Sequence, residues 1–254
     1  MSHATPRLRM FAGPNGSGKS TIKSVVEAEI GSELFGVYIN ADEIEASIRQ
    51  TGSLNLSTYG VVTTADEVFE FFRDSRFLAE KELAGDAARL EFTEGQLSFR
   101  SVAVNSYHAS VIVDFLRRKL LVAGTTFTFE TVMSHRSKVD FLRLAQERGF
   151  RTYLYYVATE DPDINVSRVA SRVAQGGHNV DRDKIVDRYY RSLELLAEAV
   201  QYANRAYIFD NSSAEKVWVA EVTDNALLSL KTDAMPRWFE TALWDKFVPE
   251  ESGD

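Results

Sequence analysis

The run Gly13-Pro14-Asn15-Gly16-Ser17-Gly18-Lys19-Ser20-Thr21 carries the strongest signal in this sequence. It satisfies the pattern G-x-x-x-x-G-K-[ST] of a phosphate-binding loop. Its glycines allow backbone N–H groups to curl around a polyphosphate, and a helix that begins near Lys19 adds the positive end of its dipole. In such loops the lysine reaches the β- and γ-phosphates, and the following hydroxyl, here that of Ser20, is a magnesium ligand. The motif therefore predicts that residues 13–21 bind a nucleoside triphosphate with Mg²⁺.

Strands and helices alternate around this loop. A strand at 7–12 ends in the glycine-rich turn, and a helix with apolar side chains at helical spacing follows at 20–30. The alternation indicates an α/β fold of the P-loop NTPase class, with a parallel sheet of about five strands covered by helices on both faces. Further strands are predicted at 35–40, 125–129, 151–157 and 205–210, and further helices at 42–49, 106–121, 137–148, 162–175 and 187–203.

Two regions fall outside this alternation. Thr64 and Glu67 form a capping box that predicts a helix through Leu83, whereas residues 90–99 show no clear period. Near the C-terminus, 216–222 and 227–231 are expected to pair as a hairpin, with Trp238 and Trp244 packing a final helix on the body. We expect one domain over residues 1–254, with a helical insertion at about 51–105 and a hairpin–helix cap at about 213–254.

Composition excludes several classes of protein. The 254 residues include 29 Lys and Arg against 37 Asp and Glu, which gives a net charge of −8. This balance argues against a broad surface for nucleic acid or anionic membrane, although it allows a local basic pocket. The chain has no cysteine, so thiolate zinc sites and Cys nucleophiles are excluded. It has neither a secretory leader pattern nor an apolar stretch of membrane-spanning length, so we expect a soluble intracellular protein.

Two motifs that hydrolytic ATPases need are missing, and this distinguishes between kinds of phosphate-loop protein. Transporter-type ATPases often share this loop but need a second motif, Leu-Ser-Gly-Gly-Gln, and the nearest string, Thr-Glu-Gly-Gln-Leu-Ser at 93–98, lacks the paired glycines. No run of four apolar residues closes on Asp-Glu, which is the usual hydrolytic element. A small-molecule kinase needs only the phosphate loop, an acceptor base and a basic lid. The sequence therefore favours a kinase-like protein over a motor ATPase.

Five short motifs, taken in their order and spacing, resemble the zeta-toxin-like kinases. The resemblance covers residues 6–50 and 105–240 and is nearest to the stand-alone branch described as predicted ABC-type ATPases. The motifs are Asn40-Ala41-Asp42-Glu43-Ile44, Phe129-Glu130-Thr131, Arg168-Val-x-x-Arg172-Val-x-x-Gly176-Gly177-His178-x-Val180, Ile185-x-x-Arg188-Tyr189-x-x-Ser192 and Asp210-Asn211-Ser212.

This resemblance implies a kinase fold and transfer of the γ-phosphate of Mg-ATP to a hydroxyl. In the characterised toxins the acceptor is UDP-N-acetylglucosamine and a small antitoxin protein blocks the site. The resemblance therefore implies that acceptor, an antitoxin in trans and a bacterial cytoplasmic location. Where the family usually has Glu-Thr-Thr or Glu-Gly-Thr, this chain has Glu130-Thr131-Val132, so one substrate-facing hydroxyl is absent. This change and the long segment at 51–105 bear on the identity of the acceptor more than on the transfer.

Three residues that follow predicted strands are candidates for acceptor binding. Asp42 lies beyond the carboxyl end of the second strand, where ligands of open α/β sheets bind. Residue chemistry allows either an N-cap for the next helix or a base for the acceptor hydroxyl, and the resemblance favours the base. Glu130, with Thr131, is a candidate for binding acceptor hydroxyls or a magnesium-bound water, against the alternative of a solvated charge at a strand end.

A cluster of arginines is the candidate phosphate lid. Arg168 and Arg172 share a helix face, and Arg188 lies in the next helix. Guanidinium groups stabilise the charge that develops on a transferred phosphoryl group, so we expect at least two of the three to contact phosphate. The alternative is a solvated helix paired with aspartates. His178, in the same lid, and Asn211, near the expected base-binding loop, are weaker candidates for nucleotide contact, and Asn211 could instead form a turn.

Two other functions remain open from the sequence. One is the same chemistry on another small acceptor, such as a nucleotide, an amino sugar or an antibiotic. The other is a nucleotide-dependent switch or ATPase that acts on a protein partner through the segment at 51–105. The choice of ATP over GTP follows the resemblance, and no guanine-reading Asn-Lys-x-Asp string occurs.

Overall fold

A computed structural model describes residues 4–177 and 179–247 of the chain. Its contacts divide the chain into two compact units. The first unit contains residues 1–35 and 128–254, and the second contains residues 36–127. The phosphate loop and the lid arginines thus belong to the first unit, whereas Asp42 belongs to the second.

The first unit is built on a sheet with the strand order β10-β9-β8-β7-β1-β6. β1, β7 and β8 are parallel neighbours, whereas β9 and β10 run antiparallel. The expected α/β fold with a mostly parallel sheet is confirmed, and the C-terminal hairpin extends that sheet beside β8. The strands are β1 (Arg7–Ala12), β6 (Phe127–Thr131), β7 (Arg151–Ala158), β8 (Arg205–Asp210), β9 (Val217–Thr223) and β10 (Leu227–Leu230).

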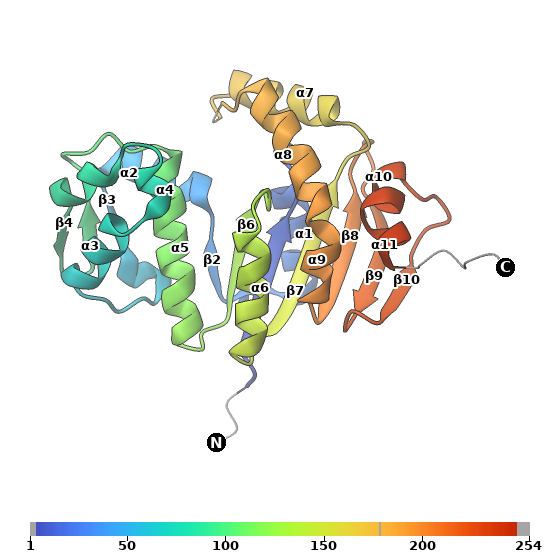
Figure 1. The fold of residues 1–254 in the computed structure, drawn as a ribbon, viewed down its shortest axis with the longest axis horizontal. Helices are drawn as coiled ribbons and strands as arrows, with labels where there is room; N and C mark the ends of the chain where they lie inside the picture. The colour runs from blue at the N-terminus through green and yellow to red at the C-terminus, as the bar shows by residue number, and fades with distance from the viewer. Residues whose placement is uncertain (1–3, 178, 248–254) are drawn as a thin grey trace. The chain divides into compact units, whose positions relative to one another are not determined.

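Helices cover both faces of this sheet. In Figure 1, α6 and α9 lie in front of the strands and α1 lies behind them. A short 3-10 turn at Ser32–Phe35 follows α1. The helices of this unit are α1 (Lys19–Ile30), α6 (Ser137–Glu147), α7 (Pro162–Ala174), α8 (Arg182–Glu194), α9 (Leu196–Gln201), α10 (Arg237–Phe239) and α11 (Asp245–Phe247), with a π-turn at Glu240–Trp244 between the last two.

The side chains of β7 show why helices must cover both faces of the sheet. Successive side chains of a strand point to opposite faces, and β7 is buried on both. Tyr155 and Val157 join the core cluster under α1 with Ile22 and Val26. On the other face, the buried Tyr156 hydroxyl lies 3.0 Å from the Ser192 hydroxyl of α8. From Tyr153 to Ala158 β7 is therefore apolar or aromatic, which is typical of a central parallel strand.

Stacked aromatic rings run across the face under α1. Tyr207 of β8, Tyr155 of β7, Phe11 of β1 and Phe35 are stacked in that order, with ring centroids 4.9, 4.5 and 5.8 Å apart. Offset stacking adds to the area that these rings bury. Desolvation by burial raises the pKa of Tyr155 to about 12, so its hydroxyl stays neutral at physiological pH. This cluster supports the helix that begins at the phosphate loop.

Two predicted boundaries in the first unit are wrong. The helix expected at 187–203 begins at Arg182 and is divided at Leu195 into α8 and α9. The strand expected to end at Phe129 continues to Thr131, so Glu130 lies inside β6. Predicted helix ends elsewhere agree closely: Asp161 caps α7 through its side chain, with Pro162 in the first turn.

A buried hydrogen bond connects the C-terminal segment to the end of β8. Trp238 Nε1 donates to Asp210 Oδ2 over 2.6 Å, and Asp210 also accepts from the backbone N–H and hydroxyl of Ser212. Trp238 is buried as expected, while Trp244 is half-buried. The last residues of the expected cap, 248–254, lie outside the described residues. This bond ties α10 to the end of β8.

The second unit contains a small sheet that the sequence did not predict. The expected insertion at 51–105 is therefore not purely helical: its strands pair in the order β3-β5-β4, antiparallel throughout. Its elements are β2 (Val37–Ile39), α2 (Ala41–Thr51), β3 (Ser53–Asn55), a 3-10 turn at Leu56–Tyr59, α3 (Ala65–Arg73), α4 (Arg76–Ala79), a 3-10 segment at Ala84–Arg89, β4 (Glu91–Thr93), β5 (Gln96–Ser98) and α5 (Ser106–Val122).

The helix predicted from Thr64 to Leu83 is broken. The capping box at Thr64 and Glu67 is present, but α3 ends at Arg73, and the Ser75 hydroxyl then accepts from the Leu78 N–H to cap α4. Apolar side chains at helical spacing continue through both helices, so the pattern alone did not reveal the break. A second N-cap inside a periodic stretch was the missed signal.

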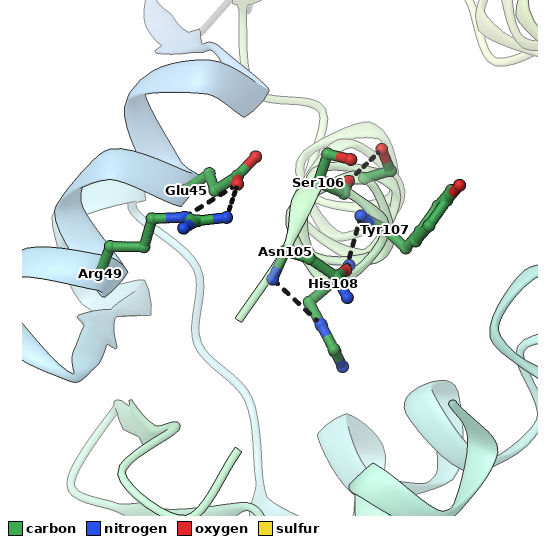
Figure 2. A network of polar contacts seen from close by, with 7 residues as sticks. Glu45, Arg49, Asn105, Ser106, Tyr107 and His108 are labelled. Carbon is green, nitrogen blue, oxygen red and sulfur yellow. Dashed lines mark hydrogen bonds and ion pairs between the residues drawn. The ribbon is translucent and has the colours of Figure 1, made fainter. Parts of the chain in front are cut away.

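α2 and α5 pack together in the second unit, with buried polar side chains on both (Figure 2). Glu45, only 5% exposed, accepts two hydrogen bonds from Arg49, at 2.9 Å from Nε and 2.6 Å from Nη2. Asn105 caps α5 by accepting from the N–H groups of Tyr107 and His108. His108 accepts from the Asn105 N–H at Nδ1 and lies 2.9 Å from Asp86 Oδ2 at Nε2. These bonds satisfy polar groups that burial would otherwise penalise.

Within the described ranges, no helix is both long enough and apolar enough to cross a membrane.

Candidate nucleotide-binding site

The phosphate loop joins β1 to α1 without a side-chain cap. Gly18, the N-cap residue of α1, has a left-handed backbone with φ 94° and supplies no side-chain cap. The first turn contains no acidic residue. The helix therefore presents its positive N-terminus to the loop, which is an arrangement suited to an anion.

Three glycines are required by the space around the loop as well as by its backbone angles. A Cβ at Gly13 would lie 2.0 Å from the Val157 carbonyl oxygen. A Cβ at Gly16 would lie 2.6 Å from the backbone oxygen of Asn165. All three glycines, including Gly18, have positive φ values. The loop is thus a cradle pressed against β7 and α7, and any side chain at these points would displace it.

Lys19 spans the mouth of this cradle. Its ammonium Nζ donates to the carbonyl oxygens of Gly13 and Pro14, each over 2.9 Å. Both acceptors belong to the loop, so the cation is fixed above the backbone that would surround a polyphosphate. This placement fits the expected role of the lysine in holding β- and γ-phosphates.

Ser20 and Glu130 provide the oxygen atoms that a magnesium ion would use. The Ser20 hydroxyl donates to Glu130 Oε2 over 2.9 Å. Among the residues that the structure describes, no group of three or more His, Cys, Asp and Glu side chains could hold a metal. Mg²⁺ needs no such cage, because it usually keeps several waters and binds one or two protein oxygens together with substrate phosphates. The donor set therefore fits Mg²⁺ bound with a nucleotide.

The three arginines of the predicted lid, Arg168, Arg172 and Arg188, make different contacts. Arg168 Nη1 donates to the Asn211 carbonyl oxygen over 2.7 Å. Arg188 Nη1 lies 3.5 Å from Asn15 Oδ1, so α8 reaches the phosphate loop directly. Arg172 stands one turn beyond Arg168 on α7, and the aliphatic part of its side chain packs beside Gly177. The structure brings Arg168 and Arg188 to the loop region, and His178 lies outside the described residues.

A buried tyrosine fixes α8 near this region. The Tyr189 hydroxyl donates to the Thr159 carbonyl oxygen over 2.6 Å, just after β7 ends. Burial raises the pKa of Tyr189, so the hydroxyl remains a neutral donor. Arg188, the preceding residue, is therefore carried on an element with a fixed attachment to the sheet.

The remaining candidate residues are placed as follows. Asn211 is buried, and its Nδ2 donates to the Ser17 carbonyl oxygen over 2.7 Å, so it supports the loop backbone. The Thr131 hydroxyl accepts from the Met133 N–H at the end of β6. In the second unit, Asp42 is exposed in the first turn of α2, and its N–H donates to Asn40 Oδ1. Asn40 is the N-cap, so the alternative that Asp42 caps this helix is wrong.

Sequence reasoning missed Asn165. This residue is fully buried on α7, and its Nδ2 donates to the Asn15 carbonyl oxygen over 2.6 Å. Its spacing from the two α7 arginines, three and seven residues, places it on their face of the helix, and this was the available signal. An asparagine on the buried side of an otherwise periodic helix needs an explanation by hydrogen bonding.

No protein-family model matches the chain. An uncharacterized protein from Haemophilus influenzae is 33% identical over 63 residues, which are 25% of this chain and 45% of that protein. The chain thus aligns with less than half the length of this relative. A solved AvrRxo1-ORF1:AvrRxo1-ORF2 structure with sulphate ions has a TM-score of 0.50 at 17% identity, covering 91% of this chain and 62% of that one. For the PezAT toxin–antitoxin system of Streptococcus pneumoniae the TM-score is 0.49 at 17% identity, covering 96% and 79%.

The strand–loop–helix cradle and the parallel sheet define an α/β phosphate-loop protein. Within that class, its fold is similar to that of the solved AvrRxo1-ORF1:AvrRxo1-ORF2 structure.

Proposed function

We propose that this chain is an ATP-dependent kinase of the zeta-toxin type, which transfers the γ-phosphate of Mg-ATP to a hydroxyl of a small molecule. The observation that carries the proposal is the phosphate loop itself, with Lys19 fixed over the cradle and the Ser20 hydroxyl paired with Glu130. UDP-N-acetylglucosamine is the first acceptor to test, because the sequence motifs resemble those of toxins that use it. Another small hydroxyl compound is the alternative within the same chemistry.

The proposed binding roles follow from the site. Residues Gly13–Thr21 surround the triphosphate, with Lys19 on its β- and γ-phosphates and Ser20 as a magnesium ligand. Mg²⁺ held by the Ser20 hydroxyl would neutralise negative charge that develops on the phosphate during transfer. Glu130 and Thr131, at the end of β6, orient the acceptor or a magnesium-bound water. Arg172 and Arg188 supply positive charge to the transferred group, and Arg168 holds Asn211 against the loop.

Asp42 is the proposed base. Its carboxylate accepts the proton of the acceptor hydroxyl while that oxygen bonds to the γ-phosphorus. The bond between this phosphorus and the β–γ bridging oxygen breaks, and ADP leaves. Support for the assignment comes from the position of Asp42 shortly after β2 and from its exposure to solvent.

A small antitoxin protein in trans and a bacterial cytoplasmic location belong to the same proposal. Both rest on the motif resemblance. The solved AvrRxo1-ORF1 structure, for its part, contains a second chain, AvrRxo1-ORF2. Inhibition of phosphate transfer by a co-encoded small protein would be the corresponding observation for this chain.

The test is transfer of γ-phosphate from Mg-ATP to UDP-N-acetylglucosamine by the unmutated protein and by Asp42→Asn. We expect Asp42→Asn to bind ATP normally and to lose about 10²–10⁴-fold in transfer, which is the usual contribution of a general base. Glu43→Gln is the matched control, since Glu43 is also exposed in the first turn of α2. Lys19→Ala should weaken both ATP binding and transfer.

Three outcomes separate the alternatives. Undiminished transfer by Asp42→Asn would remove Asp42 as the base. ATP binding without a phosphorylated product would discard this acceptor and direct the search to other hydroxyl compounds. ATP consumption that depends on a protein partner and yields no phosphorylated small molecule would favour the switch or ATPase function instead.

A further inference from the structure

We propose that Asn165 and Arg168 are positioning residues that attach helix α7 to the phosphate loop through a closed ring of hydrogen bonds. The ring passes through Asn15, Asn165, Arg168, Asn211 and Ser17, and it is closed by the backbone of α7 and of the loop. This inference rests on the nucleotide-binding part of the proposed function. It assigns Arg168 an action through Asn211, in place of direct contact with phosphate.

The first link of the ring joins α7 to Asn15. Asn165 Nδ2 donates to the Asn15 carbonyl oxygen over 2.6 Å, and Asn165 Oδ1 accepts from the Thr159 hydroxyl. A carbonyl can only accept, so these partners fix the orientation of the amide. Asn165 is 0% exposed, and loss of its amide would leave buried groups without partners. The link is therefore both specific and costly to break.

The second link joins α7 to Ser17 through a strand end. Arg168, one turn beyond Asn165, donates from Nη1 to the Asn211 carbonyl oxygen over 2.7 Å. The Asn211 side chain donates to the Ser17 carbonyl oxygen over the same distance, and the Asn211 N–H donates to Ala158 at the end of β7. Asn211 thus holds the loop from the sheet, and Arg168 holds Asn211 from the helix.

The close approach of the glycines to this ring supports the same conclusion. Gly16 adjoins the backbone of Asn165, and a Cβ on Gly18 would lie 2.2 Å from Asn211 Nδ2. The loop therefore contacts both ring members at the two glycines that allow its curvature. A change at Asn165 or Asn211 alters the surface against which the cradle is shaped.

The functional consequence concerns Arg172. Asn165, Arg168 and Arg172 follow one face of α7 at i, i+3 and i+7. With the first two bound to the loop and to its support, the third keeps a constant position relative to the phosphate cradle. Groups that are held in place before reaction need no reorganisation when charge develops, which is the basis of electrostatic preorganisation.

The test compares Asn165→Ala with Asn204→Ala in the full chain. Asn204 is a matched control, because its Oδ1 accepts from the Thr152 N–H in the same unit at the other end of β7. We expect Asn165→Ala to weaken Mg-ATP binding by about tenfold, which corresponds to loss of one buried hydrogen bond. Amide hydrogen exchange without nucleotide should accelerate in residues 13–21 and in α7. Asn204→Ala should lower thermal stability and leave both readouts unchanged.

Arg168→Ala provides the second variant. Arg168 is half-buried, so its truncation opens the same ring without emptying a core position, and it remains informative if Asn165→Ala does not fold. The loop amides should exchange faster in this variant too. In the double variant, Mg-ATP binding should be no more than about threefold weaker than in the weaker single variant, since either change opens the ring.

Unchanged loop exchange in both single variants would overturn the ring, as would additive losses in the double variant. Equal effects of Asn165→Ala and Asn204→Ala would reduce Asn165 to a general stabilising role. If the unmutated protein binds no ATP, the proposed function fails, and the inference about catalysis fails with it. Amide hydrogen exchange without nucleotide would still report whether the ring of hydrogen bonds exists. A failure of the proposed function can therefore be distinguished from a failure of the ring.

Discussion

Among the described glycines, Gly13 has the least room for an added side chain. An added Cβ would lie 2.0 Å from a carbonyl oxygen of β7, and the backbone has φ 141°. Gly149 is a useful contrast, because it has φ 79° and no described atom lies within 4 Å of an added Cβ. The two positions share a strained backbone angle for an L-residue but differ in available space.

We expect Gly149→Ala to lower the free energy of unfolding by about 1–2 kcal/mol, from backbone strain alone. Gly13→Ala should cost about 1–3 kcal/mol more, because the loop must move away from β7. Urea unfolding of both variants measures the difference. Equal losses at the two positions would mean that the loop yields to a side chain without cost.

The charge of Glu130 should affect the affinity of the site for Mg²⁺. Its carboxylate accepts from the Ser20 hydroxyl, so it orients the oxygen proposed as a ligand. Groups that orient metal ligands typically contribute about 10–100-fold to metal affinity. Glu130→Gln should raise the Mg²⁺ concentration that half-saturates ATP binding by about tenfold or more. Glu147→Gln, at an exposed position at the end of α6, should leave that concentration unchanged.

At the scale of elements, helix α3 depends on the ionisation of one side chain. Glu67 accepts from the Thr63 hydroxyl, from Lys119 and from the Thr64 N–H, and these bonds lower its pKa from 4.5 to about 2. A lowered pKa in the folded state means that the charged form contributes stability above pH 4.5. This contribution is lost as the pH falls from there towards 2.

Glu67→Gln should therefore be less stable than the unmutated protein at neutral pH, and the difference should shrink through this acidic range. Urea midpoints at neutral pH and within the range measure it. Thr63→Val removes the largest cause of the lowered pKa and should move the loss of stability to higher pH. A difference that stays constant with pH would contradict the assignment.

Elements with local signals were predictable from the sequence, and those without them were not. β1 has the predicted bounds because a short run ends at the glycine-rich loop, and β8 because Tyr207, Ile208 and Phe209 favour a strand. α7 begins where Asp161 and Pro162 indicate. The β4–β5 hairpin was missed because its two-residue turn is Glu94-Gly95, with φ 51° and 82°, in place of the usual Asn-Gly or Asp-Gly. Its three-residue strands are also too short to show alternation.

Residues of the candidate site can likewise be separated into those with a local sequence signal and those without one. The loop from Gly13 to Thr21 was predictable because every residue of its pattern has a local function. Asn165 and Asn211 act across 150 and 194 residues of sequence, and a hydrogen bond at that separation leaves no pattern along the chain. Such contacts are fixed by how β7, β8 and α7 pack. The loop itself is therefore visible as a local sequence motif, whereas the side chains that support it are revealed only by the packed structure.

At the scale of the whole molecule, the second unit contains a hydrophobic core of its own. Residues 36–127 contain the edge-packed pair Phe71–Phe115 and the tilted pair Phe72–Phe99, together with a capped α5 and a three-stranded sheet. We expect residues 36–127 alone to unfold cooperatively in urea, with near-ultraviolet dichroism from ordered aromatic rings. A broad transition without that dichroism would mean that this core needs the rest of the chain.

The Trp238–Asp210 bond has a practical consequence for spectroscopy. All three tryptophans, Trp218, Trp238 and Trp244, belong to the first unit, and the indole of Trp238 is bonded to the residue that precedes Asn211. Indole emission is therefore a native reporter for the half of the chain that carries the phosphate loop. The second unit contains no tryptophan, so the indole emission reports on the first unit alone.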